Sequence, residues 1–379
     1  MPQAELVAES NVAIAPEADF LPLNGIDHLE FFCGNAKQSA YYYRSAFGFK
    51  VTGYKGLETG SRDRTSYLIE QGKVRFVLTT PLTKDHFINE LLATHGDGVN
   101  SIAINVDDVE KAYKETTKRG AVGVEEPREI KDENGIYRTA SIRTYGDTLH
   151  TFVERRQYNG FAPGFRMVAT NDVVSRPTGI AAVDHVVGNV GWNEMNKWVK
   201  WYEEVMGFHV FISFDDKDIS TEYSALMSKV MASGSEKIKF PINEPATGKK
   251  KSQIEEYVEW YNGPGVQHIA LATGNIIDTV TKLTEQGVEF LRVPNTYYRD
   301  LESRVGKISE PIAKLEELGI LVDKDDDGYM LQIFTKPVQD RPTVFFEIIQ
   351  RRGARSFGKG NFKALFESIE REQALRGNL

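Results

Sequence analysis

Short apolar segments separated by glycine and proline recur along the chain, and most of them predict β-strands. Residues 25–32, 65–70, 74–80 and 99–106 are rich in the branched and aromatic side chains that favour strands. Between these segments, apolar residues recur at helical spacing near residues 40–47 and 109–116. The pattern therefore predicts a mixed α+β protein in which several strands follow each helix.

The pattern of the first half begins again near residue 180, which indicates an internal duplication. Residues 182–185 (Ala-Val-Asp-His) parallel residues 25–28 (Gly-Ile-Asp-His). The glycine that ends the following helix comes 20 residues after His28 and 22 residues after His185. Each half divides again into two modules of one helix between strands, so we expect four modules in all.

The duplication also sets the predicted domain boundaries. Residues 1–21 contain acidic residues before any strand and are expected to form a flexible leader. Residues 22–156 form the first domain and residues 178–379 the second. Glycines and prolines in residues 157–177 predict a linker between them.

Between the segments that correspond in the two halves, the second domain has more residues than the first. The additional residues include 243–262 and 295–319, and the apolar spacing in the latter predicts a helix. Insertions at one end of a sheet commonly build a pocket. Residues 361–374 predict a final helix with one apolar stripe, formed by Phe362, Leu365, Phe366 and Ile369.

Composition and charge exclude several function classes. The chain has 379 residues, of which 41% are hydrophobic and 26% charged, and a net charge of −8. This balance is typical of a globular protein with a sizeable core. No long basic block suggests nucleic acid as a partner, and no run approaches the roughly 18 apolar residues of a membrane span. A single cysteine and an acidic start without a signal-peptide pattern predict a reducing, cytoplasmic location.

One carboxylate lies in the middle of the strongest strand pattern, residues 343–352. Glu347 is flanked there by Phe345, Phe346, Ile348 and Ile349. An unpaired charge inside an apolar strand costs several kcal/mol, roughly, so the pattern requires a partner for this carboxylate.

Two other short strand patterns each carry a histidine, at His185 and at His268. Two imidazoles and one carboxylate are the ligand set of the facial triad that holds non-haem Fe(II). We therefore predict that His185, His268 and Glu347 converge on a metal.

The first half provides an internal control for this prediction. Its equivalent positions are His28, Ser101 and Thr151. Neutral hydroxyls are poor ligands for a first-row divalent cation, so the first half is expected to be structural. The alternative is that the second-half histidines are core residues and the carboxylate is half of an ion pair. The coincidence of all three at equivalent repeat positions favours the metal.

Other candidate groups give weaker evidence of a functional site. Residues 323–328 resemble the opening of an EF-hand loop, but Phe334 stands where the closing glutamate is required, so a solvated hairpin turn is expected. Cys33 is predicted to be a packing thiol. The remaining histidines fit no pattern and are expected to have surface or packing roles.

Several longer segments resemble one family. The C-terminal half is similar to the 4-hydroxyphenylpyruvate dioxygenase family of the vicinal-oxygen-chelate superfamily, and the resemblance extends over residues 20–379. The matching segments are residues 183–185 (VDH), 240–245 (FPINEP), 251–254 (KSQI), 265–270 (GVQHIA), 331–337 (LQIFTKP), 346–351 (FEIIQR) and 357–366 (FGKGNFKALF).

The resemblance implies an α+β fold in which duplicated βαβββ modules form two open β-barrel domains. The C-terminal domain would be catalytic, with one Fe(II) per chain held by His185, His268 and Glu347 and a C-terminal helix acting as a lid. The implied reaction converts 4-hydroxyphenylpyruvate and O₂ to homogentisate and CO₂ by oxidative decarboxylation, ring hydroxylation and side-chain migration. This reaction belongs to tyrosine and phenylalanine catabolism, and the family implies homodimers or homotetramers.

The resemblance also implies the substrate-binding residues. The polar residues are Ser228, Asn243 and Gln253, with Gln267 and Gln332 nearby, and the aromatic residues around the ring are Phe334, Phe345, Phe357 and Phe362. Strand alternation points Gln267 away from its neighbour His268, which leaves an indirect role open for it.

Three alternatives remain open at this point. A 4-hydroxymandelate synthase would use the same iron and substrate but oxidise the benzylic carbon. An extradiol enzyme would share the ligands and open a catechol. A non-catalytic binding protein on the same scaffold would be expected to lack the ligand set.

Overall fold

The computed structural model describes residues 19–168, 172–215, 220–221 and 223–378. The leader predicted over residues 1–21 lies outside the described residues up to position 18. Leu21, which follows, is buried. The first half contains β1 (Gly25–Phe32), α1 (Ala36–Phe47), β2 (Lys50–Lys55), η1 (Leu57–Thr59), β3 (Arg64–Gln71), β4 (Val74–Pro81), α2 (Phe87–His95), β5 (Gly98–Asn105), α3 (Val109–Lys118), β6 (Gly123–Asp132), β7 (Gly135–Arg143), β8 (Leu149–Tyr158) and β9 (Arg166–Met167).

The second half repeats this order with insertions. It contains β10 (Ile180–Asn189), α4 (Met195–Met206), β11 (His209–Phe214), β12 (Ala225–Ala232), β13 (Lys239–Ala246), α5 (Gln253–Tyr261), β14 (Gly265–Thr273), α6 (Ile276–Glu285), α7 (Thr296–Arg299), α8 (Leu301–Val305), α9 (Ile312–Leu318), β15 (Leu321–Lys324), β16 (Tyr329–Phe334), β17 (Phe345–Arg352), η2 (Lys359–Asn361) and α10 (Phe362–Leu375).

Two curved sheets form the molecule, and their strand orders confirm the duplication. The first sheet runs β6-β7-β8-β5-β1-β4-β3-β2-β9, and the second, read from its far edge, runs β15-β16-β17-β14-β10-β13-β12-β11. The first eight strands correspond one to one. The predicted α+β fold of βαβββ modules in two open, barrel-like sheets is confirmed. The edge strand β9 lies within the predicted linker and pairs with β2.

The hydrogen-bond register aligns the equivalent positions of the two halves. Ala103 of β5 pairs with His28 on one side and with Thr151 on the other. Ala270 of β14 pairs in the same way with His185 and with Glu347. The equivalence of these positions, inferred from sequence spacing, therefore holds at the level of single residues.

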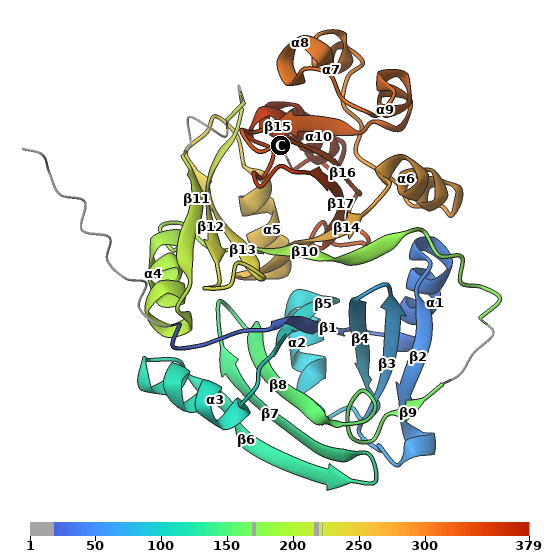
Figure 1. The fold of residues 1–379 in the computed structure, drawn as a ribbon, viewed down its shortest axis with the longest axis vertical. Helices are drawn as coiled ribbons and strands as arrows, with labels where there is room; N and C mark the ends of the chain where they lie inside the picture. Colours follow the sequence, from blue (N-terminus) through green and yellow to red (C-terminus); the bar gives the residue numbers. More distant parts are fainter. Residues whose placement is uncertain (1–18, 169–171, 216–219, 222, 379) are drawn as a thin grey trace, which may run out of the picture.

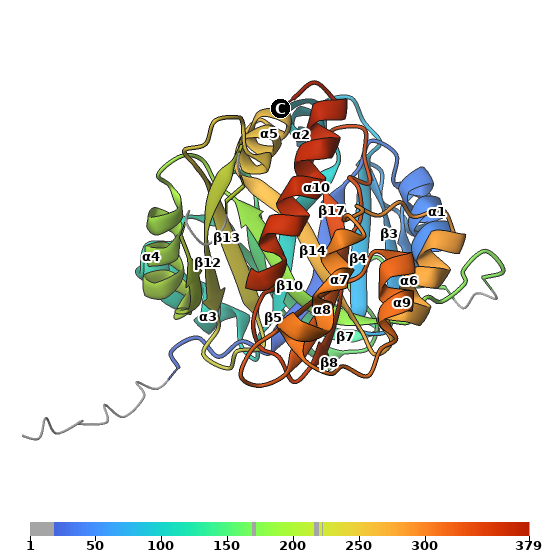
Figure 2. The same cartoon turned by 90° about the horizontal axis from the view of Figure 1, so that it is seen from above.

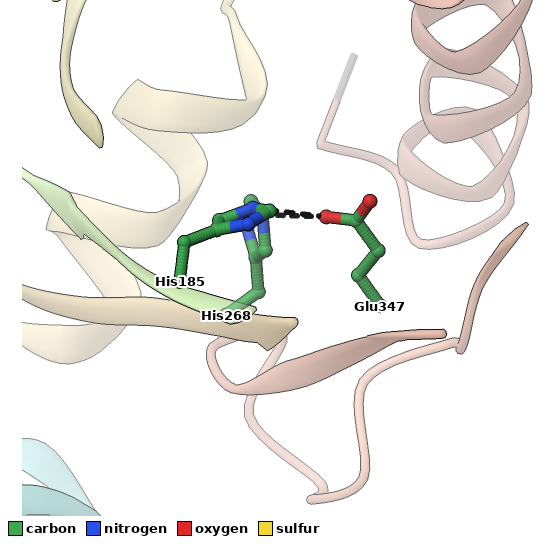
Figure 3. Close-up of side chains that lie close together, drawn as sticks. All are labelled: His185, His268 and Glu347. Carbon is green, nitrogen blue, oxygen red and sulfur yellow. Dashed lines mark ion pairs between the residues drawn. The ribbon is translucent and has the colours of Figure 1, made fainter. Parts of the chain in front are cut away.

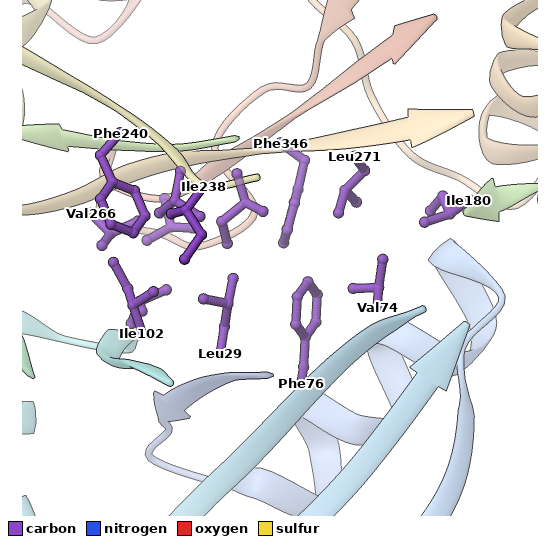
Figure 4. Close-up of a cluster of buried hydrophobic side chains, with 14 of the residues drawn as sticks. Leu29, Val74, Phe76, Ile102, Ile180, Ile238, Phe240, Val266, Leu271 and Phe346 are labelled. Carbon is purple, nitrogen blue, oxygen red and sulfur yellow. The ribbon is translucent and has the colours of Figure 1, made fainter. Parts of the chain in front are cut away.

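The two sheets pack back to back around one shared core (Figures 1 and 4). Leu29, Phe76 and Ile102 from the first sheet face Leu271 and Phe346 from the second (Figure 4), and all of them are fully buried. The hollow sides of the sheets therefore face away from each other. Figure 2 shows α10, in dark red, lying across the strands of the second sheet.

The insertions of the second half differ from the prediction in two places. Residues 295–319 form three short helices rather than one. Gly306, with a φ of 77°, ends α8, and Pro311, which has no backbone N–H, precedes α9. Residues 253–261 form α5, whose capping box joins Ser252 and Glu255. The hairpin turn predicted over 323–328 connects β15 and β16.

No helix among the described residues is long and apolar enough to cross a membrane.

The contact between the halves includes one buried histidine whose pKa should make stability depend on pH. His150 lies fully buried against Phe240 of the second half, with its Nε2 2.8 Å from the Tyr202 hydroxyl. Burial lowers the pKa of His150 to about 4. In the unfolded chain the His150 imidazole becomes protonated below about pH 6.5, whereas in the folded protein it stays neutral down to a lower pH.

We expect the free energy of unfolding of the metal-free protein to fall by about 2 kcal/mol through this residue between pH 7.5 and pH 5. Urea unfolding at the two pH values measures the change, and His150→Gln should reduce it by that amount. His209→Gln, at an exposed histidine of the second half, is the matched control. An unchanged pH dependence in His150→Gln would contradict the assignment.

Candidate metal centre

Three adjacent strands bring His185, His268 and Glu347 together on the hollow side of the second sheet (Figure 3). The Nε2 atoms of His185 and His268 lie 3.1 and 3.7 Å from Oε2 of Glu347. One ligand atom from each residue lies within 4.8 Å of the others. No second group of three such residues occurs in the part of the chain that the structure describes.

Strand alternation explains why the carboxylate is available to this group. Along β17, Phe345, Glu347 and Ile349 point to the hollow side, whereas Phe346 and Ile348 point into the shared core. Glu347 is 2% exposed. A carboxylate buried this deeply must be paired or must coordinate a cation.

Two β-bulges place the residues that support the histidines. Of the three register shifts between β10 and β14, one lies around Asp184 and one around Gln267. A bulge leaves its extra residue without a cross-strand partner and re-aims the side chain. Asp184 Oδ1 thereby lies 2.8 Å from His185 Nδ1, and Gln267 Oε1 lies 3.0 Å from His268 Nδ1. The alternation argument for Gln267 was therefore wrong, because the bulge puts it beside its neighbour.

Each histidine consequently presents Nε2 to the centre, because Nδ1 is occupied on the outer side. Such outer partners fix the orientation of a metal-binding imidazole and raise its basicity. Asp184 is held in turn by Arg351, whose Nε and Nη2 each lie 2.8 Å from its carboxylate oxygens. Burial opposes the charge of Asp184, yet Arg351 and His185 hold the pKa of its carboxyl well below the usual range.

The three central groups interact electrostatically without a cation. Burial opposes the charged form of His185, but the carboxylates of Glu347 and Asp184 raise its pKa. Burial lowers the pKa of His268. Burial also opposes the charge of Glu347, but His185 keeps the pKa of this carboxyl below its usual value. A divalent cation would replace the protons as the balancing positive charge, so the donor set fits one.

All twelve residues predicted for the site, including the triad, line one cavity. The cavity leaves about 80 Å³ for the centres of water-sized molecules. The predicted lining residues are His185, Ser228, Asn243, Gln253, Gln267, His268, Gln332, Phe334, Phe345, Glu347, Phe357 and Phe362.

Sequence reasoning missed part of the apolar wall. Phe214, Leu226 and Pro241 come from β11, β12 and β13, and Leu365 and Phe366 come from α10. The helical residues belong to the apolar stripe predicted for the last helix, so that signal was available. Strand residues that face a cavity have the same apolar pattern as residues that face a core, and no signal separates them.

The first half fills the equivalent place with hydroxyl groups. The Thr151 Oγ1 lies 2.7 Å from the Ser101 Oγ and 3.0 Å from the Ser141 Oγ. Asp27, His28 and Arg155 repeat the outer network, with Asp27 Oδ1 2.7 Å from His28 Nδ1. The supporting network is therefore duplicated, whereas the donor set belongs to the second half.

Comparisons with known proteins show which proteins the chain is similar to. The model of the glyoxalase/bleomycin resistance protein/dioxygenase superfamily matches residues 25–147 and 182–333. A 4-hydroxyphenylpyruvate dioxygenase of Dictyostelium discoideum is 52% identical over 368 residues, covering 94% of this chain and 100% of the relative. A 4-hydroxyphenylpyruvate dioxygenase of Xenopus tropicalis is 49% identical, covering 93% of this chain and 92% of the relative.

A solved structure shares the arrangement at lower identity. A mutant of 4-hydroxymandelate synthase from Streptomyces coelicolor superimposes with a TM-score of 0.83 at 28% identity, covering 93% of this chain and 100% of the other.

The duplicated network supplies a matched pair of variants. Asp184→Asn replaces the carboxylate behind His185 and should weaken metal binding about 10- to 100-fold, as loss of such outer partners typically does. Asp27→Asn makes the same change in the half without the donor set and should leave metal affinity unchanged. Competition with a chelator measures both. Equal metal affinity of Asp184→Asn and the unaltered protein would show that Asp184 does not support the ligand.

Proposed function

This chain belongs to the 4-hydroxyphenylpyruvate dioxygenase family, and on that premise we propose that its C-terminal domain binds one Fe(II) per chain and converts 4-hydroxyphenylpyruvate and O₂ to homogentisate and CO₂. One observation carries the proposal. The buried triad of His185, His268 and Glu347 borders the same cavity as six phenylalanine rings and five polar side chains.

The residues fit an iron that keeps open positions. Two imidazoles and one carboxylate occupy one side of a metal and leave the others for substrate and oxygen. When bound, Fe(II) supplies the redox and Lewis-acid chemistry that the side chains lack. The protein contributes orientation, hydrogen bonding and exclusion of water.

The polar side chains are placed to orient an oxygenated aromatic substrate. Gln332 Nε2 is buried and donates to no partner among the described residues, so it is available to a substrate oxygen. Asn243 Nδ2 donates to Asn189 Oδ1 over 3.3 Å, which fixes the amide. Ser228 and Gln253 lie on the same cavity wall. A phenolic hydroxyl in this cluster would find donors and acceptors of the kind that buried polar groups require.

The aromatic side chains restrict where the ring can lie. Phe345 stacks on His268 at 4.8 Å between ring centroids, and Phe357 meets His185 edge-on at 4.9 Å. Both rings therefore pack directly on the ligand histidines, and a flat aromatic substrate would lie against them. A ring bound in this way would lie next to the metal.

The last helix closes the cavity, and polar contacts hold it down at several points. Phe362, Phe366 and Ile369 of α10 line the cavity. Glu370 accepts a hydrogen bond from Ser224 Oγ over 2.6 Å. At the far end, Arg376 pairs with the buried carboxylate of Glu256 on α5. We propose that α10 acts as the lid that excludes water during turnover.

Glu347→Ala should abolish oxygen uptake with 4-hydroxyphenylpyruvate, because the metal loses its only carboxylate ligand. The measurement is oxygen consumption by metal-free protein reloaded anaerobically with Fe(II), with the product identified by mass and retention time. Thr151→Ala, at the equivalent position of the first half, is the matched control and should retain activity.

The product separates the proposed activity from that of 4-hydroxymandelate synthase. Homogentisate in proportion to the oxygen consumed supports the proposal. Formation of 4-hydroxymandelate would retain the iron site and refute the assignment of the ring pocket. Iron binding without oxygen uptake would favour a binding protein.

Arg376→Ala should raise the KM for 4-hydroxyphenylpyruvate about tenfold, since α10 loses a charge-assisted contact with a buried carboxylate. Iron affinity should stay unchanged, because Arg376 lies outside the metal centre. Steady-state kinetics and chelator competition test the two expectations. Lys363→Ala, at an exposed residue of the same helix, is the control. An unchanged KM would mean that this contact does not hold the lid closed.

A further inference from the structure

The first half encloses a larger cavity that the proposed reaction does not use. It lies on the hollow side of the first sheet and leaves about 480 Å³ for the centres of water-sized molecules. Its position within the fold is that of the metal centre in the second half, since His28, Ser101 and Thr151 line it. The linked hydroxyls of Ser101, Ser141 and Thr151 leave no donor set for a metal there.

Among the charged residues that line this cavity, Lys55, Glu30 and Glu90 form no ion pair with another described residue, and of the two carboxylates only Glu30 is partly buried. Lys55 is half-buried, and burial and the neighbouring Arg64 lower its pKa, whereas Glu30 and Asp63 act to raise it. Among the described residues, no carboxylate forms an ion pair with it, whereas Arg64, Arg128 and Arg143 each have one. Lys55 is therefore the uncompensated cation of the cavity.

Glu30 is the corresponding anion. Its Oε1 accepts a hydrogen bond from Thr79 Oγ1 over 2.7 Å, and Thr79 Oγ1 lies 2.8 Å from Ser66 Oγ. Among the described residues, no cation forms an ion pair with Glu30, although it lies close enough to Lys55 to influence the pKa of the ammonium. A bound molecule that carries both charges would compensate the two side chains together.

The rest of the wall suits an aromatic group. Phe32, Phe87 and Tyr137 line the cavity, and Phe161 and Phe165 come from the segment that follows β8. The ring of Phe161 meets His28 edge-on at 5.0 Å between centroids. The cavity therefore combines aromatic surface with an ammonium and a carboxylate that do not pair with each other.

The segment containing Phe161 also covers Lys55. A side chain at Gly164 would come within 3.3 Å of the Lys55 Cε, so the backbone lies directly on the lysine stem. The segment thereby covers one side of the Lys55 side chain, which lines the cavity.

We propose that this cavity is a second ligand site, separate from the metal centre, that binds an aromatic α-amino acid as its zwitterion. Lys55 contacts the ligand carboxylate, Glu30 contacts the ligand ammonium, and the side chain of the amino acid packs on the phenylalanine rings. The site takes part in binding alone, and no chemical step occurs there.

Photolabelling with p-azido-L-phenylalanine tests the proposal on the full-length, iron-loaded protein. Peptide mass spectrometry locates the label, and we expect it on β1–β3 or on residues 161–165. L-phenylalanine should protect these peptides. Phenylacetate, which lacks the ammonium, and phenethylamine, which lacks the carboxylate, should each protect at least tenfold less well. Any label in the C-terminal cavity serves as an internal reference.

Lys55→Gln and Glu30→Gln should each reduce labelling of the first cavity at least fivefold relative to that reference. Lys50→Gln, at an exposed lysine on the same strand, is the matched control. Lys55→Arg should retain part of the labelling, which would show that the loss in Lys55→Gln is not caused by misfolding. Absence of label from the first half, or equal labelling of Lys55→Gln, would overturn the proposal. If phenylacetate protected as well as L-phenylalanine, the site would bind aromatic anions in general, and the proposal of a zwitterion site would be overturned.

Discussion

The packing of Phe346 against the first half is the constraint on which the metal centre depends. Its ring lies 5.0 Å from that of Phe47 and 6.0 Å from that of Phe76, in a core that both sheets share. Because strand residues alternate between faces, burying Phe346 in that core directs Glu347 to the opposite side. A shift of one residue in β17 would exchange the two. The first half therefore contributes to the candidate metal centre by fixing the register of the strand that carries the carboxylate.

Regular alternation alone would not build the centre. A metal-binding histidine needs a partner on its outer nitrogen, and in a regular strand the adjacent residue points to the other face. The bulges at Asp184 and Gln267 remove this conflict at the two histidines. Both bulges recur in the first half, where the register shifts around Asp27 and Asn100. The backbone that supports the ligands is thus a property of the repeated module.

This origin explains which parts of the structure could be predicted from the sequence. The duplication, the domain order and the triad rest on residues whose type and spacing are visible in the chain, and a family resemblance supplied the pocket residues. The predicted orientation of Gln267 was wrong, because a bulge alters it. A bulge depends on the pairing of two strands that are distant in sequence. The helix predicted over 295–319 was wrong because its apolar spacing outweighed Gly306 and Pro311. For α5, the capping signal at Ser252 and Glu255 was present but was not used.

Comparison of the two cavities shows what distinguishes the module with the candidate metal centre from its copy. The strands, their order and the Asp-His-Arg network are the same, so the scaffold does not decide the chemistry. The difference lies at two strand positions, where His268 and Glu347 in one half correspond to Ser101 and Thr151 in the other. The hydroxyls satisfy one another by hydrogen bonds, whereas the imidazole and carboxylate remain directed at a common point. The residue types at these two positions therefore separate a set of candidate metal ligands from a hydrogen-bonded network, and the cavity of the first half has its own charged and aromatic lining.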